Sequence, residues 1–277
     1  TPVVIVDAQR PAPATGLPTR TEQADLDFTI NGSHGEFAKA VFAPGSIEEC
    51  YRMTIKAFQM ADKYQIPVII LTDQHLADSM RNIEGLDDGD AKVESFTLSR
   101  DGSARIKEYM RYKLTDSGVS PRAVPSWIQD VVYADSDEHT EEGHITESDR
   151  VRNDMVKKRF FNKTKAMQED MQAPTVFNGE KADTMLIGFG STYGVMKEAC
   201  ERKGAEYGFI HLSQVWPFPT SEVKKALEGK DKLYSVENNA SGQLAGLLRR
   251  ATGIEVDRSV LKYDGRPFNV DVLAELI

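Results

Sequence analysis

A strand, a helix and a second strand follow one another in residues 38–74, and this order constrains the fold more than any other feature. Residues 38–44 (AKAVFAP) form a short apolar run that ends in proline. Residues 46–65 have the periodicity of an amphipathic helix, and residues 66–74 (IPVIILTDQ) are apolar on both faces. A strand that is apolar on both faces is typical of a parallel sheet covered by helices. The unit therefore predicts an α/β fold.

Two signals near this unit extend the prediction. Ser46 is placed to cap the helix, and Glu49 three residues later completes a capping box. Residues 2–9 (PVVIVDAQ) are rich in β-branched side chains, which predicts a further strand buried in the sheet.

The middle of the chain interrupts the α/β pattern. Residues 81–173 are much more polar, and within them residues 150–171 have the composition of a helix. Residues 172–183 contain the proline, asparagine and glycine of a linker. We therefore predict two domains, residues 1–173 and residues 174–277.

The α/β pattern then restarts in the second domain. We predict helices ended by Gly204 and Gly253, and a short helix capped by Thr220 or Ser221. Strands and helices alternate as follows: strands in 184–190, 207–218 and 231–239, and helices in 191–204, 220–230 and 241–253.

Composition excludes several classes of protein. A chain of 277 residues that is 40% hydrophobic and 28% charged can bury a real core. Its net charge of −9 argues against a general nucleic-acid binder, which needs a basic face. No apolar run approaches the roughly 18 residues of a membrane span, and the N-terminus lacks a signal-peptide pattern. We therefore expect a cytoplasmic protein that binds neither membrane nor nucleic acid. The chain opens on a strand without an initiator Met, so we expect the natural polypeptide to continue upstream.

The cysteine count bears on redox chemistry. Cys50 and Cys200 lie far apart in the sequence, which favours reduced thiols over a disulfide. Two cysteines are also too few for an iron–sulfur cluster, whose common forms need four.

Three stretches have the composition of a site, and each also has an ordinary structural interpretation. Gly188–Gly194 (GFGSTYG) fits a phosphate-binding turn, but the following strand lacks the acidic residue of a dinucleotide site, so a tight turn is favoured. Residues 137–144 (DEHTEEGH) have metal-binding side chains, His139 and His144 among them, in what reads as a solvated acidic loop. Asp73 and His75 end a strand, where either a ligand or a helix cap is found.

The loop after the first predicted strand is the fourth candidate. Residues 9–26 contain three prolines, which restrict the backbone and let a loop hold one shape. Arg10 follows the strand at once, and its planar guanidinium suits a carboxylate or a phosphate. Thr19 adds a hydroxyl to the same loop. Composition alone leaves an anion site and a plain polar loop equally open.

Long motifs in chain order resemble the alpha subunit of 2-oxoacid:ferredoxin oxidoreductases. The motif GLPTRTEQ (residues 16–23) is more similar to the 2-oxoglutarate members than to the pyruvate members. The motifs are RPAPATGLPTRTEQADL (10–26), HGE (34–36), RYKLTDSGVSPRAVP (111–125), DEHTEEGH (137–144), MVKKRF (155–160), VENNASGQLAGLLRR (236–250) and KYDGRPF (262–268).

This resemblance implies a fold and a reaction. The fold is the later part of a thiamine-diphosphate pyrimidine-binding domain, followed by a transketolase C-terminal-like α/β domain. The reaction is the oxidative decarboxylation of 2-oxoglutarate or a related 2-oxoacid to an acyl-CoA, with electrons passed to ferredoxin. A beta subunit is implied to share the thiamine diphosphate and to hold the magnesium and the iron–sulfur cluster. The chain is therefore not expected to be active alone.

The resemblance also assigns residues. Arg10 is implied to bind the substrate carboxylate, and Thr19 to hydrogen-bond beside it. The family has glycine and serine where this chain has Ala12 and Ala14, which suggests a different backbone path there. The family's upstream YPITP-like motif and its glutamate are absent here, so we assign no catalytic residue, no cofactor-binding residue and no metal ligand.

Three other interpretations stay open on the sequence. One is a structural or assembly subunit that has lost its chemistry, which Ala12 and Ala14 permit. Another is the beta chain of a 2-oxoacid dehydrogenase, which has the same two domains. The third is a nucleotide-binding module that uses Gly188–Gly194.

Overall fold

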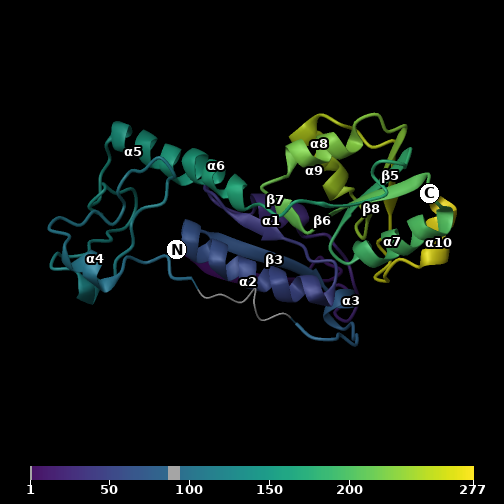
Figure 1. The fold of residues 1–277 in the computed structure, drawn as a ribbon, viewed down its shortest axis with the longest axis horizontal. Coiled ribbons are helices and arrows are strands. Elements are labelled where there is room, and N and C mark those ends of the chain that lie inside the picture. The colour runs from purple at the N-terminus through teal and green to yellow at the C-terminus, as the bar shows by residue number, and fades with distance from the viewer. Residues whose placement is uncertain (1, 87–93) are drawn as a thin grey trace.

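The computed structural model describes residues 2–86 and 94–277, and it contains two sheets with helices packed on them (Figure 1). The first sheet has the order β1-β3-β2-β7 and the second the order β4-β6-β5-β8-β9. The strands of the first are β1 (Val3–Gln9), β2 (Ala40–Phe42), β3 (Pro67–Asp73) and β7 (Gln214–Trp216). Those of the second are β4 (Thr175–Phe177), β5 (Thr184–Phe189), β6 (Tyr207–Leu212), β8 (Lys232–Glu237) and β9 (Arg258–Leu261).

The predicted strand–helix–strand unit is present in the first sheet. Strands β2 and β3 are parallel, and α2 (Ile47–Tyr64) connects them. The Ser46 side chain accepts a hydrogen bond from the Glu49 amide at 3.2 Å, which confirms the predicted cap. The Glu49 carboxylate in turn accepts from the Gly45 amide at 2.7 Å. Both contacts pair backbone N–H groups that a helix start otherwise leaves free.

Strand β1 differs from the prediction, because it is not buried. It pairs only with β3 and lies at the edge of the sheet. Val3, Ile5 and Val6 are 43%, 46% and 63% exposed. The apolar composition of a strand indicates a preference for burial, but it does not determine which neighbours cover the strand. In β1 the apolar side chains on the outer surface stay exposed.

The second half departs from the prediction in its connections. The predicted linker contains β4, which pairs with β6 antiparallel. The single predicted strand of residues 207–218 is two strands that break at Ser213, and the second of them, β7, leaves for the first sheet and pairs with β2 antiparallel. This pairing joins the two sheets through the backbone. The domain boundary near residue 173 stays a prediction.

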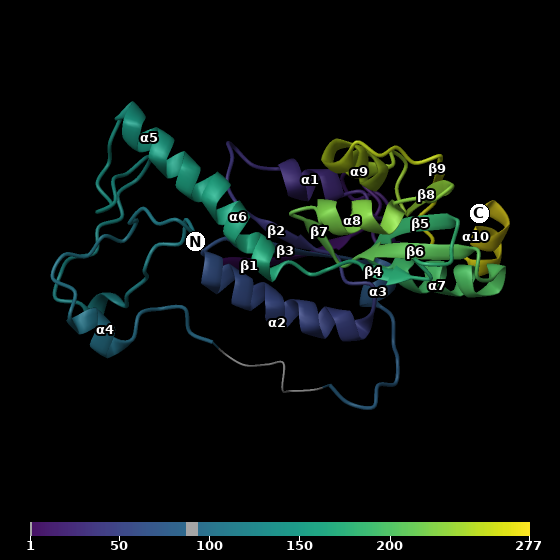
Figure 2. The same ribbon diagram turned by 45° about the horizontal axis from the view of Figure 1, so that its top comes forward.

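Four helices cover the second sheet. Helices α8 and α9 lie on one side of it and α7 and α10 on the other (Figures 1 and 2). Gly204 and Gly253 follow two of these helices at positive φ, as predicted. Neither Thr220 nor Ser221 caps α8, because Pro219 stands at that position without a side-chain hydrogen bond. Their bounds are α7 (Thr192–Lys203), α8 (Thr220–Leu227), α9 (Gln243–Thr252) and α10 (Val270–Leu276); α10 and β9 were not predicted.

The polar middle of the chain extends away from both sheets (Figure 2). Its helix, predicted as one element, is α5 (Asp149–Val156) and α6 (Lys163–Met167) with a π-helical turn, Lys157–Asn162, between them. Within the described residues, no helix is both long and apolar enough to cross a bilayer. The remaining short helices are α1 (Leu26–Asn31), α3 (Gln74–Ala77), α4 (Arg100–Ala104) and the 3-10 turns Pro125–Trp127 and Gln168–Asp170.

Candidate functional site

The loop after β1 stands where ligands bind in open α/β sheets, beyond the carboxyl ends of parallel strands. Arg10 directly follows the last residue of β1. The side chain of that residue, Gln9, donates to the Thr72 carbonyl of β3 at 3.3 Å and accepts from the Asp25 amide at 3.1 Å. The first bond holds the start of the loop on the sheet. The second brings Asp25, near the end of the loop, next to that start.

The loop has a defined backbone shape. The Leu17 amide donates to the Pro11 carbonyl at 3.3 Å, and Gly16 between them has a φ of +50°. A Cβ at Gly16 would lie 1.9 Å from that carbonyl oxygen, so only glycine fits. Ala14 also has a positive φ, of 52°, which alanine rarely adopts.

The two predicted substrate residues lie in this one loop. Arg10 is half-buried, and its guanidinium donates a hydrogen bond to the Thr15 carbonyl, so the loop orients the side chain. Thr19 is exposed. In the described residues no hydrogen bond joins the two side chains, so their shared role stays a prediction.

The second domain holds the base of the loop through Gln23, which is fully buried. The Gln23 amide donates to the Asn238 carbonyl at 2.7 Å, and its side chain accepts from the Asn238 amide at 3.1 Å. The same side chain donates to the Phe189 carbonyl at 2.8 Å. Closer to the loop, the Thr21 amide donates to the Gly265 carbonyl at 3.3 Å. The motif around Gly265 therefore contacts the opening loop, although the two lie far apart in sequence.

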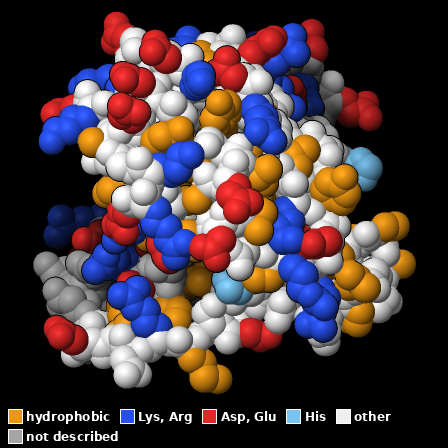
Figure 3. Space-filling view, turned by 90° about the vertical axis from the view of Figure 1, so that its right-hand side faces the viewer, with side chains coloured by type: hydrophobic (Ala, Val, Ile, Leu, Met, Phe, Trp, Pro, Cys, Tyr) orange, Lys and Arg blue, Asp and Glu red, His pale blue; other side chains and the backbone are white. Residues whose placement is uncertain are grey.

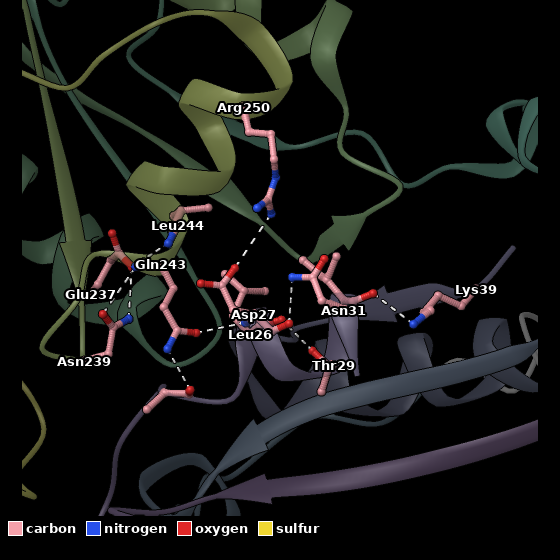
Figure 4. Close-up of polar contacts among 12 residues, drawn as sticks. Leu26, Asp27, Thr29, Asn31, Lys39, Glu237, Asn239, Gln243, Leu244 and Arg250 are labelled. Atoms are coloured by element: carbon pink, nitrogen blue, oxygen red, sulfur yellow. Dashed lines mark hydrogen bonds and ion pairs between the residues drawn. The ribbon is translucent and has the colours of Figure 1, made fainter. Parts of the chain in front are cut away.

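A buried carboxylate, that of Glu237, organises the turn at the start of α9 (Figure 4). Glu237 is fully buried and accepts hydrogen bonds from the amides of Leu244 and Ala245, at 2.7 and 3.0 Å, and from the Asn239 side chain at 3.0 Å. The two amides belong to the first turn of α9, where a negative charge is favourable. Asn239 also donates to the Gln23 carbonyl at 3.1 Å, so this turn and the loop base form one network.

Gln243 and Arg250 of α9 extend this network to α1 (Figure 4). The Gln243 side chain donates to the Ala24 carbonyl at 2.7 Å and accepts from the Asp27 amide at 2.9 Å. Arg250 forms an exposed ion pair with Asp27 at 3.7 Å, which contributes little. Sequence reasoning missed Gln23, Glu237 and Gln243, because a polar side chain reveals its burial only through partners from distant segments.

Three carboxyl groups near the loop base have raised pKa values. Burial raises the pKa of Glu22, against the effect of the Ala12 backbone, and the charge of Asp25 raises it further. Burial also raises the pKa of Asp25 itself, and burial together with Asp25 raises that of Asp7. Burial and the repulsion between these carboxylates therefore oppose additional negative charge at the base of the loop.

Two of the other sequence candidates meet at a cavity of about 530 Å³, lined among others by His75, Tyr193 and Lys197. Asp73 caps α3, because its side chain accepts a hydrogen bond from the Leu76 amide at 3.0 Å, so the helix-cap interpretation holds for this residue. His75 is exposed. The glycine-rich turn packs on the first domain, with the Gly190 amide donating to the Ala43 carbonyl at 3.2 Å.

The acidic loop at residues 137–144 is bound to the long helix by ion pairs. Glu138 pairs with Arg159 at 2.6 Å and with Arg152 at 2.8 Å, and these partners lower its pKa to about 2. His139 stacks on Tyr112 with ring centroids 3.7 Å apart. Across the described ranges, no group of three His, Cys, Asp or Glu side chains is placed to hold a metal ion.

Comparison with known proteins identifies the family. Residues 1–158 match the family described as pyruvate flavodoxin/ferredoxin oxidoreductase, thiamine diphosphate-binding, which is more than half of the chain. The chain belongs to this family. Residues 182–273, which include the glycine-rich turn, match the pyruvate:ferredoxin oxidoreductase core domain II, so both halves of the chain match the same kind of protein.

Individual relatives agree with this family. The chain is 36% identical over 281 residues to the alpha subunit of 2-oxoacid:ferredoxin oxidoreductase 1 from Sulfurisphaera tokodaii, covering 100% of this chain and 44% of that protein. It is 27% identical over 258 residues to a 2-oxoglutarate synthase subunit, KorA, from Methanothermobacter marburgensis, covering 92% of this chain and 67% of that protein. The chain thus spans under half of the first relative's length.

A solved structure confirms the predicted fold class. The 2-oxoglutarate:ferredoxin oxidoreductase from Magnetococcus marinus, solved with 2-oxoglutarate, coenzyme A and succinyl-CoA bound, superposes with a TM-score of 0.90 at 32% identity. The match covers 100% of this chain and 48% of that one. The predicted order, a thiamine-diphosphate-binding domain followed by a second α/β domain, is therefore correct.

Proposed function

We propose that this chain is part of the alpha subunit of a thiamine-diphosphate-dependent 2-oxoacid:ferredoxin oxidoreductase. The enzyme decarboxylates 2-oxoglutarate or a related 2-oxoacid oxidatively, yields an acyl-CoA and passes electrons to ferredoxin. The observation that carries this proposal is similarity along the whole chain to named alpha subunits, together with the close superposition on a 2-oxoglutarate enzyme. A beta subunit completes the active site.

Arg10 binds the carboxylate of the 2-oxoacid, and Thr19 donates a hydrogen bond beside it. Three features of the loop support this role for Arg10: its place at the carboxyl edge of the sheet, the bond to the Thr15 carbonyl that orients it, and a loop backbone that Gly16 makes possible. A guanidinium with one donor committed still has a fork for a carboxylate. Ion pairs in open solvent are weak. The pair between Arg10 and the substrate carboxylate therefore needs the beta subunit to shield this exposed loop from solvent.

The cofactor is shared with the beta subunit. When bound, thiamine diphosphate supplies the carbanion that attacks the keto carbon and then stabilises the charge left by the departing carbon dioxide. A diphosphate–magnesium unit needs several oxygen ligands together. We assign the magnesium and the iron–sulfur cluster to the beta subunit, as the resemblance to the family implies, and the two cysteines of this chain are fewer than the four that the common clusters need.

The proposal is tested in the full-length protein, purified together with its beta subunit. Reduction of a viologen dye is measured with 2-oxoglutarate, pyruvate and 2-oxobutyrate, each with coenzyme A. Reduction with 2-oxoglutarate at the highest kcat/KM is the expected result. If no 2-oxoacid supports reduction, the chain is not part of such an enzyme.

The Arg10→Ala variant tests the residue assignment. Removing one charge-assisted pair of hydrogen bonds is expected to raise the KM for the 2-oxoacid about 30-fold or more. Arg20→Ala is the matched control, because Arg20 is exposed in the same loop. An unchanged KM in Arg10→Ala would remove Arg10 from substrate binding.

A further inference from the structure

A second cavity lies at the opposite end of β1 from Arg10. It has a volume of about 730 Å³, and Pro2 and Val3, at the amino end of that strand, line it. A strand of seven residues is about 23 Å long, so this cavity is well separated from the loop at the carboxyl edge. Its other walls come from residues 34–38 and 65–67, from the polar middle of the chain between residues 111 and 139, and from the helix of residues 149–167.

Cationic side chains dominate the lining of this cavity. Some have carboxylate partners: Arg122 pairs with Asp62, and Arg152 and Arg159 share Glu138. Arg111, Lys158 and Lys163 form no ion pair with any described residue. The cations in the lining are Arg111, Arg122, Arg152, Lys158, Arg159 and Lys163. By contrast, the C-terminal end of the molecule mixes acidic and basic side chains over its surface (Figure 3).

Lys158 and Lys163 are buried cations, and neither forms an ion pair with a described residue. Lys158 is 5% exposed and Lys163 is 9% exposed. The amine of Lys158 donates to the Tyr112 carbonyl, and that of Lys163 lies 3.4 Å from the Gln65 carbonyl. Burial and the neighbouring cations lower the pKa of Lys158 to about 7 and that of Lys163 to about 8. Burying two mutually repelling ammonium groups costs free energy that a bound anion relieves.

The π-helical turn places both lysines on the cavity. In an α-helix, residues five positions apart point about 140° away from each other. A π turn closes its hydrogen bonds between residues five positions apart and brings them to one side, and the turn here is Lys157–Asn162. Such turns are rare and occur often at functional sites. The π turn therefore lies where it brings the two positively charged lysines to the same side of the helix.

We propose that this cavity binds the phosphate group of a small phosphorylated ligand. Lys158, Lys163 and Arg111 supply N–H donors that have no ion-pair partner among the described residues, and phosphate oxygens accept such charged donors. The volume is typical of a small-molecule site and exceeds that of free phosphate. Flat side chains for the rest of a ligand are present too: Phe37 lines the cavity, and His139 lines it while stacked on Tyr112.

The test uses the full-length protein in the assembly in which it is purified. Binding of two probes, inorganic phosphate and ADP, is measured by calorimetry at pH 7. Binding of ADP alone assigns the phosphate of a nucleotide, and equal affinity for phosphate assigns the free anion; either result supports the site. Binding of neither probe overturns it.

Variants locate the site. Lys158→Met and Lys163→Met are each expected to weaken binding about tenfold or more, because each removes a charge-assisted contact. Arg111→Gln, which is only half-buried and therefore less able to disturb folding, is expected to do the same. Lys165→Met is the matched control, since Lys165 is exposed on the same helix, and it leaves affinity unchanged. Equal affinity in all four variants overturns the assignment.

Proton uptake gives a readout that a purely structural role does not change. A bound anion raises the pKa of both lysines, so binding near pH 7.5 takes up protons, and affinity falls as the pH rises through about 8. Calorimetry in two buffers of different ionisation enthalpy measures this uptake, which Lys158→Met reduces. Other charged or titratable groups that face the lysines contribute to the profile: Arg111, Arg159, Glu141, His34, Glu36, Arg122, His139 and Arg152.

Discussion

Replacing Glu237 by glutamine tests whether the buried carboxylate holds the second domain against the loop. Its two oxygens accept three hydrogen bonds: Oε2 from Leu244 and Asn239, and Oε1 from Ala245. A glutamine offers only one acceptor oxygen. Whichever way the amide is turned, at least one buried backbone N–H then faces an NH2 group.

The expected cost follows from these contacts. A buried donor without an acceptor costs about 1–3 kcal/mol. Loss of the negative charge at the start of α9 adds about 0.5–2 kcal/mol. The turn and the first turn of α9 should therefore open about 2–4 kcal/mol more easily in Glu237→Gln than in the wild-type protein.

Hydrogen exchange is the suitable assay, because a chain with two sheets need not unfold in one step. Exchange of the amides in residues 243–252 should accelerate about 30-fold or more, since about 1.4 kcal/mol is a factor of ten. Glu222→Gln is the control: Glu222 lies in the first turn of α8, but it is exposed and bonds only the Ser221 hydroxyl. An acceleration below about threefold in Glu237→Gln would refute the stated role of the carboxylate.

Two further predictions concern the loop and the acidic segment. Gly16→Ala is expected to raise the KM for the 2-oxoacid about tenfold in the viologen assay, because its Cβ meets the Pro11 carbonyl. Gly229→Ala, at positive φ in open space, is the control, and equal effects would refute the steric argument. Glu138 has its pKa lowered from 4.5 to about 2, so its ion pairs stabilise the fold above pH 4.5 and are lost as the pH falls towards 2. The protection factors of the amides in residues 137–160, taken against the intrinsic exchange rate at each pH, should fall over that range, and fall less in Glu138→Gln; identical profiles would contradict this.

Local signals in the sequence predicted much of the fold. The cap at Ser46 and the helix ends at Gly204 and Gly253 depend on neighbours within one turn, and the structure has all three. The alternation of apolar runs and amphipathic helices likewise predicted the α/β class, because each period reports one kind of element.

Features that depend on distant contacts could not be predicted. The apolar run of residues 207–218 gives no sign that it breaks at Ser213 and crosses to β2, since that choice depends on which sheet edge is free. The π turn has the composition of an ordinary helix. The exposure of β1 depends on what packs beside it and not on its own residues.

The site was predicted only where a motif could be recognised. Composition made Arg10 and Thr19 candidates, and the resemblance assigned their roles, which stay predictions; the structure adds how the loop orients Arg10. The buried lysines of the second cavity gave no such signal, because lysine is ordinarily exposed and a basic helix is ordinarily a solvated one.

The contacts of the opening loop give the second domain a role at the proposed substrate site. The half of the loop that follows Thr19 is held by Gly265 and Asn238, both from the second domain. At Gly265 a Cβ would lie 2.8 Å from the side chain of Leu17, so that backbone packs directly on the loop. The first half of the loop, with Arg10, is held by the first domain through Gln9. A small shift between the domains would therefore move Thr19 relative to Arg10, and the distance between the two proposed substrate groups is set by the interface that Gln23 fills.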